Sequence, residues 1–194
     1  MIFCNHKNIY QWFTVLLLAT MPTLVWSEES AMNIKDNAST SFAKDLKYEL
    51  LFRNLGKQVF SELKGNPPGR MTTKNLVLLS KMEQHNTEVM SVVRGHFDVD
   101  NTIRCKDKIL AKTVIISLKV MPDIGTRYLE GSAERFVHQL EEIQATSPEG
   151  YEEEMAYMVG HEKALYGYLV HLNKGEQQRA HAVLEQFVSE NNIQ

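Results

Sequence analysis

The chain has 194 residues, of which 43% are hydrophobic and 23% are charged, and its formal net charge is -3. This length suits one globular domain or two small ones, and the composition is that of an ordinary folded protein. The slightly acidic balance excludes the basic surface of a typical nucleic-acid-binding protein, so we expect no nucleic-acid partner.

The N-terminus carries the pattern of a secretory signal peptide. Lys7 precedes an almost unbroken apolar run at residues 13–26, FTVLLLATMPTLVW. This run is shorter than the roughly 20 residues that span a bilayer comfortably, and Val25 and Ser27 suit a cleavage site after Ser27. An uncleaved N-terminal anchor is the alternative. We therefore expect a signal peptide at residues 1–27, a flexible polar leader at 28–41, and an exported, periplasmic domain at 42–194 that is not stably inserted in a membrane.

Two amphipathic helices are predicted next, joined by a short turn. The first spans residues 42–63, and its stripe at helical spacing contains Phe42, Leu46, Glu49, Phe52, Gly56, Phe60 and Leu63. The turn GNPPG at residues 65–69 ends it. The second helix opens at Thr72 or Thr73 and ends near Gly95. Its stripe contains Leu76, Leu79, Glu83, Asn86, Met90 and Val93, so polar residues interrupt both apolar stripes.

Residues 97–122 form a long connection. Its second half, ILAKTVIISLKVM at residues 109–121, is rich in β-branched side chains, which favour a strand. A single strand would have no partner in this chain, so we expect a short helix or a crossover segment that ends at Pro122.

Three further helices follow. The first opens at Asp123 or Thr126 and has Glu130 at the margin of its apolar stripe. A turn at residues 146–150 leads to the next helix, at 151–172, and a last helix covers 176–189. The stripe of the 151–172 helix alternates steps of four and three residues and contains Tyr151, Met155, Met158, Glu162, Leu165, Leu169 and Leu172. A carboxylate inside such a stripe is costly unless another group pairs with it.

The expected elements are all helices, so the sequence predicts an all-α fold. The three connections between the four long helices are short, long and short. They are typical of a ferritin-like four-helix bundle with a long crossover between helices two and three, here with an extra C-terminal helix. An up-and-down bundle with an extra helix between its halves is the alternative.

A family resemblance agrees with this architecture. The segment MAYMVGHEKALYGYLVHLNKGE at residues 155–176 resembles the last bundle helix of small exported bacterial ferritin-like proteins, in which a His-Glu pair precedes Ala-Leu. The run MEQHN at residues 82–86 is similar in placement to the metal-binding helix of rubrerythrin-type proteins. The likeness is specific only around these two motifs.

The resemblance implies a di-iron carboxylate site. Such a site takes a Glu from each of two helices and a Glu-x-x-His motif from each of the other two, because iron prefers mixed carboxylate and imidazole ligands. The candidate ligands here are Glu49, Glu83, Glu130, His161 and Glu162. Both motifs are broken, because Asn86 stands where the pattern has His and Met158 stands where it has Glu.

The alternative for these residues is a buried hydrogen-bonded network of Glu83, Asn86, His161 and Glu162 that fixes the helix register. No nucleophile constellation or phosphate-binding loop is visible in the sequence. We therefore favour a non-catalytic exported bundle that acts by protein contact or in envelope maintenance and needs no cofactor. The other function is a di-iron or single-metal oxidoreductase or metal store, with iron or manganese as the metal.

Overall fold

The computed structural model describes residues 38–97, 99, 102–103 and 105–194. All secondary structure in this part of the chain is helical: α2 (Ala38–Leu63), α3 (Thr73–His96), α4 (Cys105–Val120), α5 (Pro122–Ala145), α6 (Glu152–Asn173) and α7 (Gln177–Glu190). The all-α prediction is confirmed. The predicted signal peptide lies outside the described residues, and α2 begins one turn earlier than Phe42, within the predicted leader.

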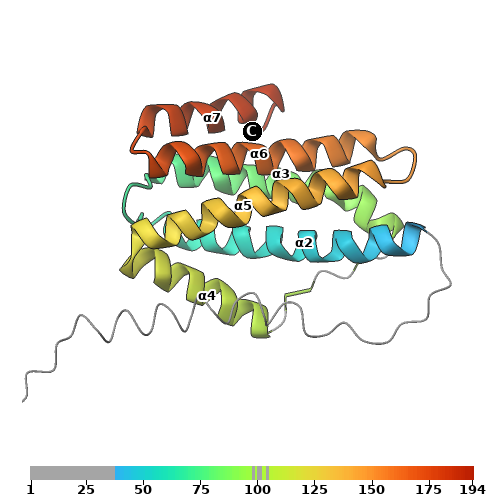
Figure 1. Ribbon diagram of the computed structural model, residues 1–194, viewed down its shortest axis with the longest axis horizontal. Coiled ribbons are helices and arrows are strands. Elements are labelled where there is room, and N and C mark those ends of the chain that lie inside the picture. Colours follow the sequence, from blue (N-terminus) through green and yellow to red (C-terminus); the bar gives the residue numbers. More distant parts are fainter. Residues whose placement is uncertain (1–37, 98, 100–101, 104) are drawn as a thin grey trace, which may run out of the picture. The chain divides into compact units, whose positions relative to one another are not determined.

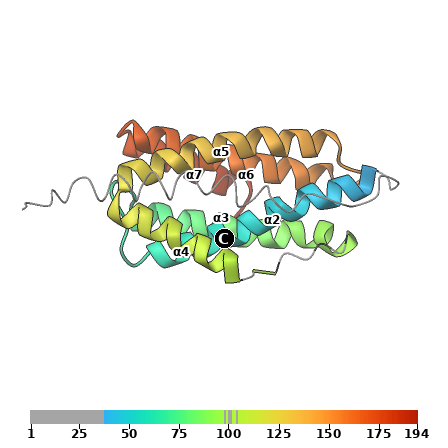
Figure 2. The same cartoon turned by 60° about the horizontal axis from the view of Figure 1, so that its bottom comes forward.

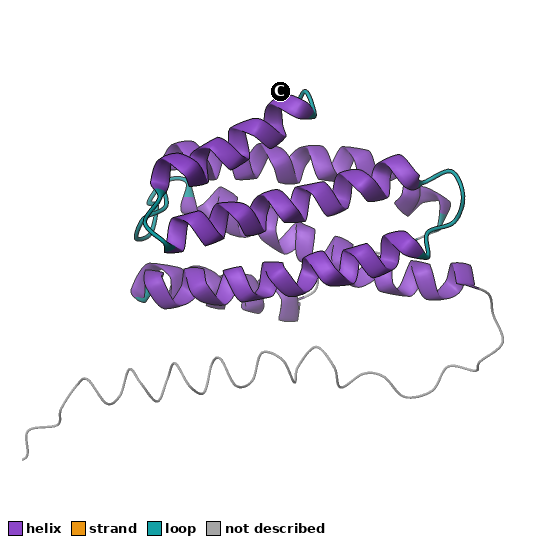
Figure 3. Cartoon of the chain, turned by 45° about the horizontal axis from the view of Figure 1, so that its top comes forward, coloured by secondary structure: helices purple, strands orange, loops and turns teal. Residues whose placement is uncertain are grey.

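Four long helices form the body of the domain (Figure 1). Helix α2 contacts α3 and α5, and α6 contacts the same two helices, so the four close into a ring. Helix α4 packs on the outside against α2 and α5, whereas α7 packs against α6 and α3. The loops gather at the two ends of the bundle (Figure 3). No helix among the described residues is long and apolar enough to cross a membrane.

The order of the helices follows from the lengths of their connections. Short turns join α2 to α3 and α5 to α6, and each pair is antiparallel (Figure 1). Helices α3 and α5 run in the same direction along the bundle, so the chain must return along its length between them. Helix α4 makes this return.

Helix boundaries form where the sequence supplies the right local groups. The side chain of Thr72 accepts a hydrogen bond from the Asn75 backbone N–H at 3.2 Å and caps α3. Pro122 occupies the first turn of α5, where its missing N–H costs no hydrogen bond. Gly150, before α6, has a φ of +95°, a conformation that suits glycine.

The β-branched segment of the connection is helical. In α4, the side chains of Ala111, Ile115 and Leu118 are buried at helical spacing. This packing outweighs the modest preference of β-branched residues for strands. The segment is therefore the expected short helix, and this helix also carries the chain along the crossover between α3 and α5.

The core of the bundle has two apolar ends separated by a polar layer. One apolar cluster contains Phe42, Leu46, Leu50, Met90, Leu140, Met155 and Met158. The other contains Leu55, Val59, Leu63, Leu76, Leu79, Leu169 and Leu172, together with residues of α4 and α7. Between them on α2, α3 and α6 lie six buried polar residues: Glu49, Arg53, Glu83, Asn86, His161 and Glu162. We call these six residues the polar layer.

Candidate functional site

Arg53 is the centre of the polar layer. Arg53 is only 6% exposed, and arginine is rarely buried this deeply without partners. Its Nη2 lies 2.5 Å from Glu162 Oε2, and its Nη1 lies 3.2 Å from His161 Nδ1 and 3.6 Å from Glu83 Oε1. One guanidinium group on α2 therefore holds partners on α3 and α6.

Four of the five candidate metal ligands lie in this layer. Glu83 is on α3, whereas His161 and Glu162 are neighbours on α6, and all three face Arg53. Glu49 lies one turn before Arg53 on α2, where the charge of Arg53 reaches it. The structure thus brings these four residues together around a cation of the chain itself.

Glu130 lies elsewhere, which corrects the expectation that it joins the other four. Its Oε2 accepts a hydrogen bond from Asn173 Nδ2 at 2.5 Å, and Asn173 Oδ1 accepts one from Thr126 Oγ1 at 2.6 Å. Asn173 ends α6, roughly 16 Å along the helix from Glu162 at 1.5 Å per residue. We call Thr126, Glu130 and Asn173 the end cluster.

Arg53 is the residue that the sequence analysis missed. The predicted stripe of the first helix contains Phe52. Regular steps of four and three residues from Glu49 lead instead to Arg53 and then to Gly56. Phe52 is only half-buried and packs against Phe136 with the two rings tilted and 4.8 Å between their centroids. Strict spacing would have identified a buried cation beside the carboxylates.

The contact with Arg53 fixes the tautomer of His161. A guanidinium group donates hydrogen bonds and accepts none, so His161 Nδ1 must be the acceptor. The ring proton then sits on Nε2, which lies 3.7 Å from Glu83 Oε1. Burial, and secondarily the charge of Arg53, lowers the pKa of His161 well below its usual range. His161 is therefore neutral in the folded protein.

Protons balance the remaining negative charge. Burial raises the pKa of Glu83 to about 8 and that of Glu49 to about 7, and Arg53 offsets only part of this effect. Burial also raises the pKa of Glu162, against the opposing effect of Arg53. For Arg53 itself, burial favours the neutral form, but Glu162, Glu83 and Glu49 together raise its pKa. One cation cannot neutralise three carboxylates, so the layer retains protons near neutral pH.

Hydrogen bonding in the polar layer is incomplete. The buried atoms without a hydrogen-bond partner among the described residues include Glu49 Oε2, Glu83 Oε2, Glu162 Oε1, Arg53 Nε and both side-chain polar atoms of Asn86. Each such group carries a desolvation cost of about 1–3 kcal/mol. The layer is thus a costly feature of the core.

Gly56 makes room for one of these carboxylates. A Cβ atom at Gly56 would lie 2.9 Å from Glu83 Oε1, closer than carbon and oxygen can approach without a shift. The missing side chain on α2 therefore lets the carboxylate of α3 reach the position beside Arg53.

These residues do not fit a di-iron centre. Glu130 is absent from the layer, Asn86 and Met158 occupy two expected ligand positions, and the guanidinium group of Arg53 already engages Glu162 and His161. No group of three or more His, Cys, Asp or Glu side chains within the described ranges has the arrangement that holds a metal ion.

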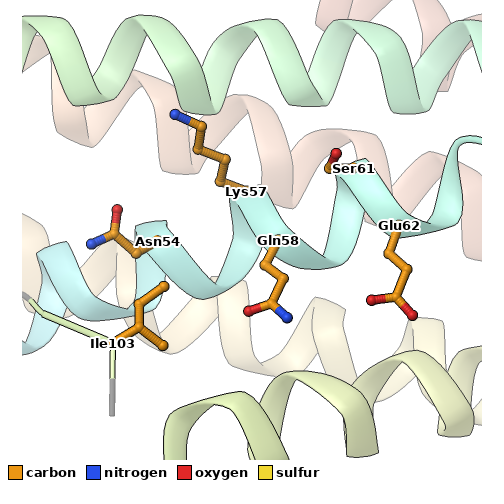
Figure 4. A pocket seen from close by; sticks show the side chains of 6 residues that line it. All are labelled: Asn54, Lys57, Gln58, Ser61, Glu62 and Ile103. Carbon is orange, nitrogen blue, oxygen red and sulfur yellow. The ribbon is translucent and has the colours of Figure 1, made fainter. Parts of the chain in front are cut away.

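A hollow on the surface of α2 is separate from the polar layer. It is lined by Asn54, Lys57, Gln58, Ser61 and Glu62 of α2 and by Ile103 of the segment between α3 and α4 (Figure 4). Substrate pockets are usually concave and largely apolar, with a few convergent polar groups. This hollow is open to solvent on one side rather than enclosed, and it shares no residue with the layer.

No family model matches the chain, and no similar protein was found among curated proteins or solved structures.

Proposed function

We propose that this protein is an exported, non-catalytic helical bundle that acts by protein contact, and that its polar layer fixes the register of the helices. The observation that carries this proposal is Arg53, which supplies the cation between Glu83 and Glu162. The export component rests on the apolar run at residues 13–26, whose pattern is that of a signal peptide.

The position of the layer explains how it would select one register. Apolar clusters flank it on both sides, so sliding one helix by a turn would move a charged group into an apolar end of the core. An unpaired buried charge is strongly unfavourable. Arg53 pairs with both α3 and α6, so it penalises displacement of either helix relative to α2.

We further propose a ferritin-like origin for this bundle, with a degenerate carboxylate cluster. Two features support this proposal: the chain returns along the bundle between α3 and α5, and four of the five candidate ligands share one layer. In this interpretation, Arg53 has taken the charge-balancing role that metal ions have in a di-iron bundle.

Elemental analysis of the protein purified without chelators tests the absence of metal directly. We expect no stoichiometric metal, and we expect iron or manganese to leave the melting temperature unchanged. A stoichiometric metal together with a rise in melting temperature would overturn the proposal, because a ligand of the folded state stabilises it by mass action. Loss of that rise in Glu162→Gln would assign the metal to the polar layer.

A metal-binding function is the second candidate. The unpartnered oxygens of Glu49, Glu83 and Glu162 favour it, because carboxylate oxygens are ligands for iron and manganese. It requires Arg53 to leave its present position. The same metal titration on Arg53→Met separates the two candidates, since a metal-binding protein would gain affinity when the competing cation is removed.

A further inference from the structure

Exposed aliphatic side chains gather on α4. Six large hydrophobic side chains are exposed in the described part of the chain, and four of them lie on α4 or in the first turn of α5: Ile109, Ile116, Val120 and Ile124. Single exposed aliphatic residues are normal, whereas a group of them marks an interaction surface. Ile109 is 66% exposed and Ile116 is 60% exposed.

These side chains form a seam at coiled-coil spacing. Ile109, Thr113, Ile116 and Val120 follow one another by four, three and four residues, as do the core positions of a heptad repeat. Ala111, Ile115 and Leu118, on the opposite side of α4, are buried against the bundle. In Figure 2, where α4 comes forward, none of the other described helices lies in front of it, and among these helices it contacts α2 and α5. We call Ile109, Thr113, Ile116 and Val120 the α4 seam.

Lysines line one flank of the α4 seam. Lys112 and Lys119 each precede a seam residue, Thr113 and Val120, so they occupy the same heptad position one repeat apart. Both are exposed, and neither forms an ion pair with another described residue. The other flank carries Leu110 and Ser117, which are uncharged.

This charge pattern gives α4 no favourable charge pairing with a second copy of itself. In a parallel pair, each lysine would face the uncharged flank of the other copy. In an antiparallel pair, Lys112 and Lys119 would face their own counterparts, and like charges repel. A helix with acidic residues beside its own aliphatic seam complements α4 in either orientation.

We propose that the α4 seam docks an acidic amphipathic helix of a protein partner. The aliphatic rows of the two helices pack together, and Glu or Asp residues of the partner pair with Lys112 and Lys119. This inference rests on the proposed contact function and names its surface. The bundle already holds α4 as a helix, so the entropy cost of ordering a helix on binding falls mainly on the partner. Aliphatic anchor residues packed between the two helices supply the affinity.

The test uses a helix-stapled, fluorescently labelled three-heptad peptide with Leu at its core positions and Glu at both flanks. Fluorescence anisotropy with the full-length protein should show saturable binding that weakens as salt rises. Replacing Lys112 and Lys119 together by Glu should weaken binding at least about tenfold and create binding to the same peptide with Lys flanks. Ile109→Ser with Ile116→Ser should abolish binding of either peptide. The matched control replaces Lys81 and Lys174, two exposed lysines outside α4, by Glu and should bind as the wild type does.

Several outcomes would overturn the α4 proposal. They are absence of saturable binding, unchanged binding by the Ile109/Ile116 double variant, self-association that this variant abolishes, and adsorption to phosphatidylglycerol vesicles through the same residues. Circular dichroism of each variant establishes that the bundle is intact. Elemental analysis tests the expected absence of bound metal without involving α4. Failure of the α4 proposal is therefore distinguishable from failure of the proposed function.

Discussion

The polar layer and the end cluster use similar side chains in opposite ways. In the end cluster, Asn173 donates to Glu130, accepts from Thr126, and accepts from Arg70 through its backbone carbonyl at 3.2 Å. In the polar layer, Asn86 is 1% exposed and neither polar atom of its side chain has a partner among the described residues. The end cluster completes its hydrogen bonds beside solvent, whereas the layer holds incompletely paired charges in the core.

This difference determines how each cluster should respond to mutation. A cluster whose hydrogen bonds are complete loses only their modest net free energy when one member is removed. A buried ionic network loses much more when one partner is removed, because the remaining charges stay buried. Replacing the whole network with apolar side chains removes that cost and can stabilise the fold.

The largest expected effect comes from Arg53→Met. Removing the guanidinium group leaves the carboxyl groups of Glu162 and Glu83 buried without their cation. We therefore expect the free energy of unfolding to fall by about 3–5 kcal/mol. Urea denaturation monitored by circular dichroism measures this change. Arg70→Met, which removes an exposed arginine that donates to Asn173 of the end cluster, is the matched control and should cost about 1 kcal/mol or less. Equal effects of the two substitutions would abolish the distinction between the clusters.

Replacing the network as a unit should reverse the sign. In Arg53→Met combined with Glu83→Leu and Glu162→Leu, the unpaired charges disappear along with the cation. We expect a free energy of unfolding equal to that of the wild type or about 1–4 kcal/mol higher. The register-fixing role predicts a cost of a different kind, namely broadened NMR resonances or alternative packing. A triple variant as unstable as Arg53→Met alone would argue against a net cost of the layer.

The pH dependence of stability reports mainly on Glu83. Its pKa rises from 4.5 to about 8 on folding, so between these values the folded state binds more protons than the unfolded state. Stability from this group is therefore fully present below pH 4.5 and is lost as the pH rises through about 8. His161 acts in the opposite sense: its depressed pKa costs stability only below about 6.5, where the unfolded imidazole gains a proton.

We therefore expect the free energy of unfolding to fall by about 1–2 kcal/mol between pH 6.5 and 8.5, where Glu83 dominates over His161. Glu49, with its pKa near 7, contributes in the same direction. Glu83→Gln should flatten this slope, and Glu130→Gln should leave it unchanged. Denaturation series at several pH values provide the measurement, and a stability that rises across this window would contradict the assigned protonation states.

Helical spacing made the fold predictable because it reports which face of a helix is buried. It also placed Glu83 and Glu162 inside the core, since both interrupt otherwise apolar stripes. It did not report the level of a residue along the bundle. Two contacts set the axial register of α5 against α6: Tyr166 Oη donates to Glu134 at 3.2 Å, and Thr126 lies opposite Asn173. At this register, Glu162 lies level with residues near His138 on α5. His138 is about two turns along α5 from Glu130. Axial register depends on the turn at residues 146–150 and on packing between α5 and α6, which no single stripe contains.

Gly56→Ala tests the close approach inside the layer. Helix propensity alone favours alanine over glycine by about 1 kcal/mol. Here the new Cβ would displace the Glu83 carboxylate, which lies in a buried network, so we expect a net destabilisation of about 1 kcal/mol. In a Glu83→Ala background the obstacle is gone, and Gly56→Ala should stabilise. A double-mutant cycle measures the coupling, and additive effects would show that Glu83 moves aside freely.

The smallest expected effect is that of Glu130→Gln. The amide oxygen can still accept the hydrogen bond from Asn173, so only the contribution of the charge is lost, about 0.5–1 kcal/mol or less near solvent. The unfolding transition should barely move, and iron or manganese should affect this variant and the wild type alike. This second readout matters most, because it separates the residue from the other four candidate ligands by chemistry rather than by stability. If Glu130→Gln changed a metal-dependent melting shift, α5 would have to contribute a ligand, and the axial register of α5 against α6 described here would be wrong.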